Sequence, residues 1–131
     1  MEFVRKHKTQ TGYINVSCPE LTAIDLVENE KSVGGLNRVC TVLNELAETM
    51  NMDSLDDSFF KTSAIPVFQR LGYILEHVLE RAELAETLYS KIEVAGLKFR
   101  KIPFKINKPT EGCEVDKKWK VIINQEIEID E

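Results

Sequence analysis

The stretch VFQRLGYILEHVL, residues 67–79, decides the fold of this chain. Its apolar residues recur at helical spacing and, together with Ile65 just before it, cover about half of the circumference of a helix. A helix with so wide an apolar arc contacts neighbours on several sides, so we place it at the centre of the domain. The arc consists of Ile65, Val67, Phe68, Leu71, Ile74, Leu75, Val78 and Leu79.

Polar residues form a single row along the same helix. We predict that this polar row marks the edge where the helix leaves the core and turns toward an opening in the protein. Gly72 lies on the apolar side, where a glycine costs about 1 kcal/mol of helix propensity. We therefore expect another backbone to approach closely at Gly72. The polar row consists of Gln69, Arg70, Tyr73, Glu76 and His77.

Several other segments carry patterns of regular structure. Alternation predicts two strands at 3–8 and 13–18, and a Ser17/Glu20 capping box starts a helix that runs to about residue 28. The clearest amphipathic helix spans 36–50, a short helix passes through residues 59–60, and another helix runs over 83–92 with Gly96 as its C-cap. Residues 28–35 are a polar loop. Extended segments follow at 97–106, interrupted by Pro103, and at 118–131.

The order of these elements predicts an α+β domain. We expect the N- and C-terminal strands to share one small mixed or antiparallel sheet, with a layer of four to five helices on one of its faces. The length of 131 residues favours a single domain, 1–131.

Charge is unevenly distributed along the chain. Residues 16–95 hold six basic and fourteen acidic side chains, whereas residues 96–120 hold eight basic and three acidic ones. A basic segment in an acidic protein can bind a polyanion such as a nucleic acid, or it can simply face the acidic helices. The sequence leaves both interpretations open. The candidate anion contacts are Lys98, Arg100, Lys101 and Lys105.

Other function classes lack their signatures. The chain has no apolar run of membrane-spanning length and no signal-peptide core, so the cytoplasm is the expected location. Cys18, Cys40 and Cys113 are odd in number and widely spaced, which predicts reduced thiols rather than disulfides or a zinc site. No phosphate-binding loop, nucleophile elbow or metalloprotease motif is present, and we expect neither a cofactor nor a metal.

Three charged residues form a further candidate site. Asp25 on the first helix is a possible partner for Arg38 or Arg70, and a structural salt bridge is the simplest interpretation. Two arginines that frame an anion site are the alternative, because a guanidinium binds carboxylate or phosphate bidentately. The candidate functional surface comprises Asp25, Arg38, Gln69, Arg70 and Tyr73.

Four stretches, in this order and at this spacing, resemble the C-terminal domain of the AbiEi family of antitoxins. They are VSCPELTAIDLV, GGLNRVCTVLNELAE, FQRLGYILE and DKKWKVIINQEIEID. The resemblance implies an antitoxin of a bacterial type IV toxin–antitoxin system. Its toxin would be a nucleotidyltransferase of the AbiEii type, countered without a stable complex. Family members usually carry an N-terminal winged-helix domain that binds DNA, and we expect none before the first strand here.

The sequence leaves three hypotheses for the function of the chain. The leading hypothesis is a non-enzymatic antitoxin whose polar row and basic segment contact an RNA or a phosphorylated group. A DNA-binding regulator is the second, and it would bind with affinity that falls steeply as salt rises. The third is a small enzyme that modifies the toxin, for which Asp25 and Thr22 are poor candidate catalytic residues.

Overall fold

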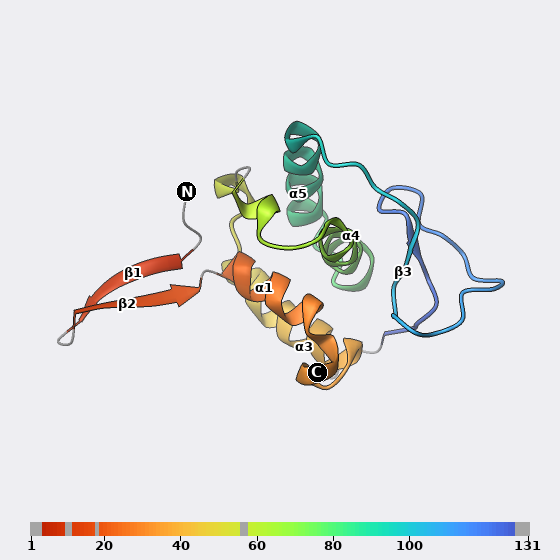
Figure 1. Cartoon of the computed structure of the whole chain (residues 1–131), viewed down its shortest axis with the longest axis horizontal. Coiled ribbons are helices and arrows are strands. Elements are labelled where there is room, and N and C mark those ends of the chain that lie inside the picture. Colours follow the sequence, from red (N-terminus) through yellow and green to blue (C-terminus); the bar gives the residue numbers. More distant parts are fainter. Residues whose placement is uncertain (1–3, 10–11, 18, 56–57, 128–131) are drawn as a thin grey trace.

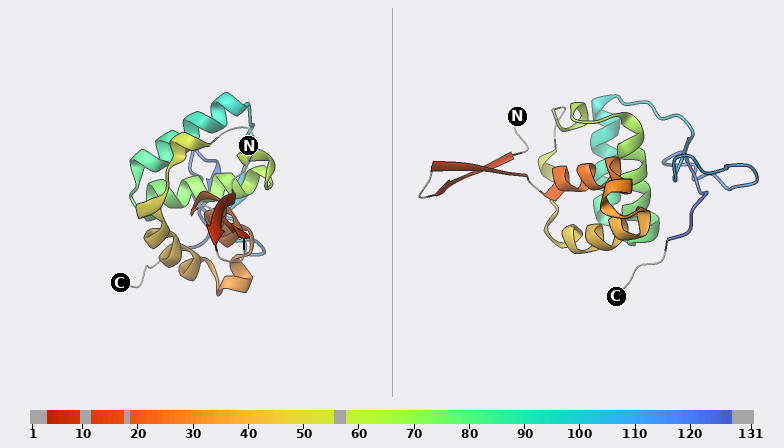
Figure 2. Two further views of the ribbon diagram at one scale, coloured as in Figure 1. Left: turned by 90° about the vertical axis from the view of Figure 1, so that its left-hand side faces the viewer. Right: turned by 60° about the horizontal axis from the view of Figure 1, so that its bottom comes forward.

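A helical body lies between two extended segments in the computed structural model of the chain (Figures 1 and 2). The structure describes residues 4–9, 12–17, 19–55 and 58–127. The α-helices are α1 (Pro19–Glu28), α2 (Glu30–Val33), α3 (Leu36–Leu46), α4 (Ile65–Tyr73) and α5 (Ala82–Ala95). Short 3₁₀ turns are η1 (Ala47–Thr49), η2 (Met52–Ser54) and η3 (Phe59–Lys61), and η4 (Ile74–Val78) is a π-helical turn.

The strands form two separate pairs. β1 (Val4–Thr9) and β2 (Gly12–Ser17) make an antiparallel hairpin that projects from one end of the helical body (Figure 1). β3 (Ile102–Pro103) and β4 (Val121–Ile122) are short and pair in parallel on the opposite side of the body. The prediction of an α+β domain is confirmed. The single shared sheet is wrong for the described residues, because β1 pairs with β2 and β3 pairs with β4 in two separate sheets.

The helical body has the core that its periodicity predicts. α1 covers residues 19–28 as expected, and α3 with η1 covers most of 36–50. The apolar face of α3 is buried, and Val39, Cys40 and Leu43 have no exposed surface. Residues 28–35, expected to be a loop, instead contain the single turn α2, which ends at two glycines with positive φ, Gly34 and Gly35.

Helix α4 runs through the centre of the body, as predicted. Pro66 occupies its first turn, and Val67, Phe68 and Leu71 point into the core. The helix then widens into η4, where the amide of Leu79 donates to the carbonyl of Ile74 over five residues at 2.9 Å. A π turn adds one residue to the helical circuit, and such turns are frequent at functional sites.

Residues 97–127, which we call the C-terminal arm, pass over α4 with little regular structure (Figure 2). The long strand expected from residue 118 onward does not form within the described residues. Asp116 is the physical reason, because its carboxylate accepts the amide of Trp119 at 2.7 Å and closes a turn. Lys120 then takes a left-handed conformation with φ of 56°, which breaks the extended chain before β4.

Candidate functional site: the C-terminal arm and the helix beneath it

The polar row on α4 is covered by the C-terminal arm rather than open to solvent. Gln69, Arg70 and Tyr73 are only 1%, 9% and 8% exposed. The prediction that this row marks an open edge is therefore wrong for these three residues. Glu76 is half-buried, and only His77 at the end of the row is exposed.

Gln69 and Arg70 hold the backbone of the C-terminal arm. The side-chain amide of Gln69 donates to the carbonyls of Arg100 at 2.7 Å and Trp119 at 2.8 Å. The Nε of Arg70 donates to the carbonyl of Pro103 at 3.0 Å. Strand β3 at Pro103 and the segment that precedes β4 at Trp119 are thus attached to one helix by side-chain donors, which satisfy these backbone carbonyls.

A buried acid accompanies Arg70. Burial lowers the pKa of Arg70, and the charge of Glu30 in α2 opposes that shift. Glu30 is itself buried and forms an ion pair with Lys105 of the C-terminal arm at 2.7 Å. The second carboxylate oxygen of Glu30 is buried without a hydrogen bond. One candidate anion contact, Lys105, is therefore occupied by a protein carboxylate.

The indole of Trp119 lies directly on α4. A Cβ on Gly72 would overlap the six-membered ring of the indole, so only glycine fits at this position. The predicted close approach at Gly72 is confirmed, although a side chain rather than a backbone makes it. Trp119 is fully buried, and its Nε1 donates to the carboxylate of Glu76 at 3.1 Å.

Charged groups close the junction between η4 and the C-terminal arm. The Nε2 of His77 lies 2.9 Å from a carboxylate oxygen of Asp116, the residue that also holds the Trp119 turn. Lys118 forms an ion pair with Glu76 at 2.9 Å and a second one with Glu86 of α5. The two regions are thus joined by hydrogen bonds and ion pairs as well as by the indole.

These contacts shift the ionisation of Glu76 and Lys118. Burial acts to raise the pKa of Glu76, but hydrogen bonds from Lys118 and Trp119 and the charges of Lys118 and His77 outweigh it, so that the pKa falls below its ordinary value. Burial acts to lower the pKa of Lys118, and its bonds to Glu76 and Glu86 raise it overall. The bonded carboxylate of Glu76 therefore favours the folded state.

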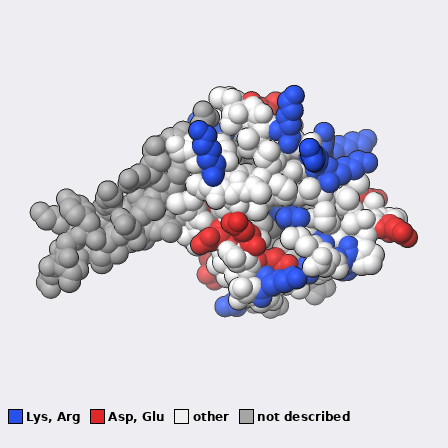
Figure 3. Space-filling view, in the orientation of Figure 1, with Lys and Arg blue, Asp and Glu red and all other residues white. Residues whose placement is uncertain are grey.

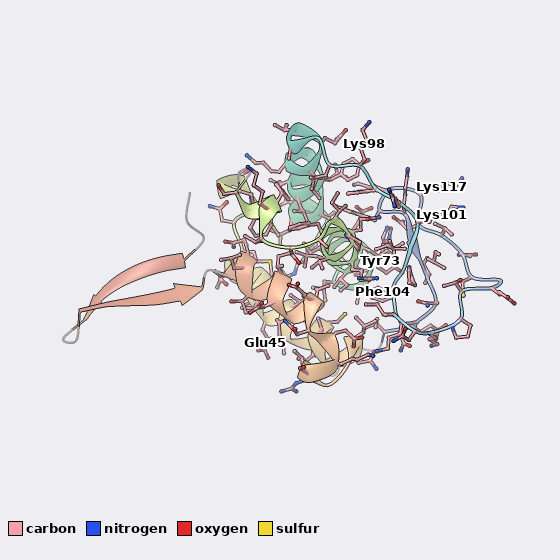
Figure 4. The ribbon with its side chains drawn as sticks, viewed as in Figure 1. Glu45, Tyr73, Lys98, Lys101, Phe104 and Lys117 are labelled. Carbon is pink, nitrogen blue, oxygen red and sulfur yellow. The ribbon has the colours of Figure 1, made fainter. Side chains whose placement is uncertain are left out.

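Tyr73 packs against the arm through its ring. Its centroid lies 5.0 Å from that of Phe104 and 5.2 Å from that of His77. Figure 4 shows Tyr73 of α4 and Phe104 of the arm side by side. Burial, followed by the charges of Asp116 and Cys40, raises the pKa of Tyr73, so its hydroxyl stays protonated at neutral pH.

Asp25 and Arg38 do not join Arg70. Both are exposed, on α1 and α3 respectively, whereas Arg70 is buried under the C-terminal arm. The ion pairs among the described residues include none between Asp25 and either arginine. The structure therefore does not bring the three residues together as an anion site.

Free cations gather on the outer side of the C-terminal arm. Lys98, Arg100 and Lys101 are exposed and form no ion pair with a described acid, and the same holds for Lys117 and Lys120. Lys98, Lys101 and Lys117 lie on the same side of the molecule in Figure 4, and Figure 3 shows blue side chains gathered there while red ones lie over the lower helices. We call Lys98, Arg100, Lys101, Lys117 and Lys120 the basic face. Lys117 and Lys120 are among the eight basic residues counted over 96–120, although the candidate anion contacts named from the sequence did not include them.

Comparison with known families settles the relationship of the chain. A family model described as the AbiEi antitoxin C-terminal domain matches residues 3–77 of the 131-residue chain. The chain belongs to this family. The AbiEi domain is therefore an antitoxin of a toxin–antitoxin or abortive infection system. Neither the curated proteins nor the solved structures include a match.

The AbiEi match ends within η4, so Gln69, Arg70 and Tyr73 lie inside it and the C-terminal arm beyond it. The structure nevertheless joins both parts through the contacts of α4 with the arm. Among the described helices, none has the length and apolar character to cross a membrane. The described His, Cys, Asp and Glu residues include no group of three or more placed to hold a metal ion.

Proposed function

We propose that this AbiEi domain is a non-enzymatic type IV antitoxin that counters a nucleotidyltransferase-like toxin without forming a stable complex. Its basic face contacts RNA, so that the antitoxin acts on the target of the toxin rather than on the toxin itself. The observation that carries the proposal is the basic face, a set of exposed cations in a chain whose net charge is −5.

Charge separation supports a polyanion as the ligand of the basic face. A protein with excess negative charge repels a polyanion except where cations are concentrated and free of acidic partners. Lys105 and Lys118 are engaged by Glu30, Glu76 and Glu86, so they add little to such a surface. The cations of the basic face remain available for phosphates.

Two features support a non-enzymatic role. Burial raises the pKa of Cys40 to about 12, which makes this thiol a poor nucleophile. The paired His77 and Asp116 lie beside Tyr73, whose raised pKa keeps its hydroxyl protonated and weakly nucleophilic. The described residues therefore offer a histidine without an activated nucleophile next to it.

Growth rescue tests the proposal. We expect the charge-reversed double variant Lys98→Glu/Lys101→Glu to lose protection when it is co-expressed with a cognate nucleotidyltransferase-like toxin. The matched control is Lys31→Glu/Lys61→Glu, which reverses two exposed lysines outside the arm and should rescue growth fully. Full rescue by the folded Lys98/Lys101 variant would remove the basic face from the function.

A mixing experiment tests the absence of a stable complex. Purified antitoxin and toxin should elute separately from a size-exclusion column at micromolar concentration. Co-elution at a fixed stoichiometry would contradict that part of the proposal, because it would indicate direct neutralisation.

A further inference from the structure

A groove of about 470 Å³ lies between the first turns of α4 and the start of the C-terminal arm. Its volume falls in the range of about 300–1,000 Å³ that is usual for small-ligand sites. Helix and arm both contribute walls, so the groove exists only while the arm is attached. The lining residues are Ile65, Pro66, Gln69, Lys98, Arg100 and Ile102.

The lining divides into an apolar part and a cationic part. Ile65, Pro66 and Ile102 are partly exposed and supply apolar surface, whereas Lys98 and Arg100 are exposed cations of the basic face. The combination matches a ligand that carries a flat, weakly polar group next to a negative charge. A nucleotide unit has both parts, because its base is planar and its phosphate is anionic.

Gln69 fixes the width of the groove. Its amide nitrogen donates to the carbonyls of Arg100 and Trp119, and it is buried, so the wall that carries Arg100 is tied to α4. A site held in this way is formed before the ligand arrives, which lowers the ordering cost of binding.

We propose that this groove receives one unstacked base of a single-stranded RNA while Lys98 and Arg100 bind the adjoining phosphates. The proposal rests on the proposed function, which directs the basic face to RNA, and it names the form of RNA that is recognised. Lys101 and Lys117 extend the cationic track beyond the groove on the same side of the molecule (Figure 4).

Strandedness follows from the apolar part of the lining. In a duplex the bases are stacked and paired, so only phosphates and sugars reach a protein surface of this kind. A single strand can turn a base out and bury it against Ile65, Pro66 and Ile102. Duplex RNA should therefore use the cations alone and bind more weakly than a single strand of equal length.

Fluorescence anisotropy with the full chain tests the assignment. The probes are a labelled twelve-nucleotide oligouridylate, an RNA duplex of twelve base pairs, the corresponding single-stranded DNA and a polyglutamate peptide. We expect the oligouridylate to bind at least about tenfold more tightly than the duplex or the peptide. The single-stranded DNA should bind about as tightly as the oligouridylate, because it offers the same kinds of base and phosphate to the groove. A preference of less than about tenfold over the duplex or the peptide would overturn the assignment to a single strand.

Two variants separate the apolar and cationic contributions. Ile65→Ser should weaken oligouridylate binding about fivefold and leave duplex binding within about twofold, because it removes only apolar contact. Arg100→Ala should weaken both and reduce the magnitude of the salt slope, log Kd against log salt, by about 0.7 for the single strand. Lys31→Ala is the matched control and should change neither affinity nor slope. An unchanged oligouridylate affinity in folded Ile65→Ser would overturn the base-binding role of the groove.

Comparison with growth rescue distinguishes this proposal from the function it rests on. If Lys98→Glu/Lys101→Glu loses rescue while the wild type prefers duplex RNA, the groove assignment fails and the antitoxin surface stands. If the wild type prefers the oligouridylate but the double variant still rescues growth, the proposed function fails. Circular dichroism and thermal unfolding of each variant verify that the fold is retained.

Discussion

The helical body, residues 19–96, and the C-terminal arm both bury large side chains, but they do so by different means. In the body, apolar residues such as Val39, Leu43 and Phe68 recur at helical spacing and pack face to face. The arm has two strands of two residues each, and it buries Trp119 and Phe104 from irregular backbone. Its position depends on donors from α4 that satisfy its carbonyls.

This difference shows that the arm has little regular secondary structure to hold it in place without α4. Regular helices satisfy their backbone groups through their own backbone, whereas the arm relies on side chains, namely Gln69 and Arg70 of α4 and its own Asn124. Asn124 is buried and binds the backbone of Lys105 and the carbonyl of Lys108. Changes at the junction should therefore loosen the arm before they loosen the body.

The largest effect is expected for Trp119→Ala. Removal of the fully buried indole leaves a cavity over Gly72 and deletes the bond to Glu76, and we expect the free energy of unfolding to fall by about 3–5 kcal/mol. Urea denaturation measures the change. The control Ile106→Ala, at an exposed site on the arm, should stay within about 0.5 kcal/mol. A cost for Trp119→Ala near that of the control would show that the arm is not anchored by its indole.

Gly72→Ala should cost about 3 kcal/mol, the upper end of the range for overpacking, because its Cβ overlaps the indole. The same substitution in a Trp119→Ala background should instead stabilise the helix by up to about 1 kcal/mol, since alanine is the better helix former. A double-mutant cycle by urea denaturation gives the coupling. Additive effects of the two substitutions would contradict the contact.

Gln69→Leu should lower the free energy of unfolding by about 1–3 kcal/mol, because it leaves the carbonyls of Arg100 and Trp119 without their donor. Hydrogen exchange followed by mass spectrometry should show faster exchange over residues 98–122 than over α3. Gln125→Leu is the control, because the hydrogen bonds of Gln125 with Lys108 and with the carbonyl of Glu126 are exposed to solvent, and it should leave both regions unchanged. Uniform loss of protection across the molecule would argue against a separately released arm.

The contribution of Glu76 should depend on pH. Its folded-state pKa lies below the ordinary value, so its stabilisation is present above the ordinary carboxyl pKa of about 4.3 and is lost as pH falls through the folded pKa. The difference in stability between wild type and Glu76→Gln should therefore be largest near neutrality and shrink in acid. Thermal unfolding at several pH values measures it. Glu45→Gln, at an exposed position, is the control and should differ little from wild type in stability at every pH. A stability difference for Glu76→Gln that grew in acid would contradict the lowered pKa of Glu76.

The smallest effect is expected for Lys101→Glu. Lys101 is exposed and forms no described ion pair, so stability should change by less than about 0.5 kcal/mol. Thermal unfolding at low and physiological salt checks this value. A large loss would mean that the basic face supports the fold rather than a ligand.

Periodicity was sufficient to predict the helical body. The apolar positions of 36–50 and 65–79 repeat at steps of three and four, and α3 and α4 bury them. Gly72 was also informative, because a glycine inside the apolar face of a helix costs helix propensity and therefore indicates a close contact at that position. The cap at Gly96 was predicted correctly as well, and it takes a left-handed conformation with φ of 77°.

The covering of the polar row was not predictable from its residue types. Gln69 and Arg70 are polar, so the hydrophobicity pattern places them at the surface. Their partners are backbone carbonyls, which occur at every residue and therefore leave no mark in the sequence. The alternation over 118–131 predicted a strand, but local bonding at Asp116 and the left-handed Lys120 outweighed it. For the basic segment, the interpretation that it faces the acidic helices is confirmed at Lys105, which pairs with Glu30. The interpretation that it binds a polyanion stays a prediction.

The way in which Gln69 and Arg70 attach the arm has a consequence for its evolution. Both side chains grip main-chain oxygens, so the anchorage does not depend on which residues stand at positions 100 and 103. Mutations can accordingly change the exposed side chains at these positions without detaching the arm from α4. If the ligand of the protein changes during evolution, the outer side chains of the C-terminal arm can change with it while the helical body keeps its structure.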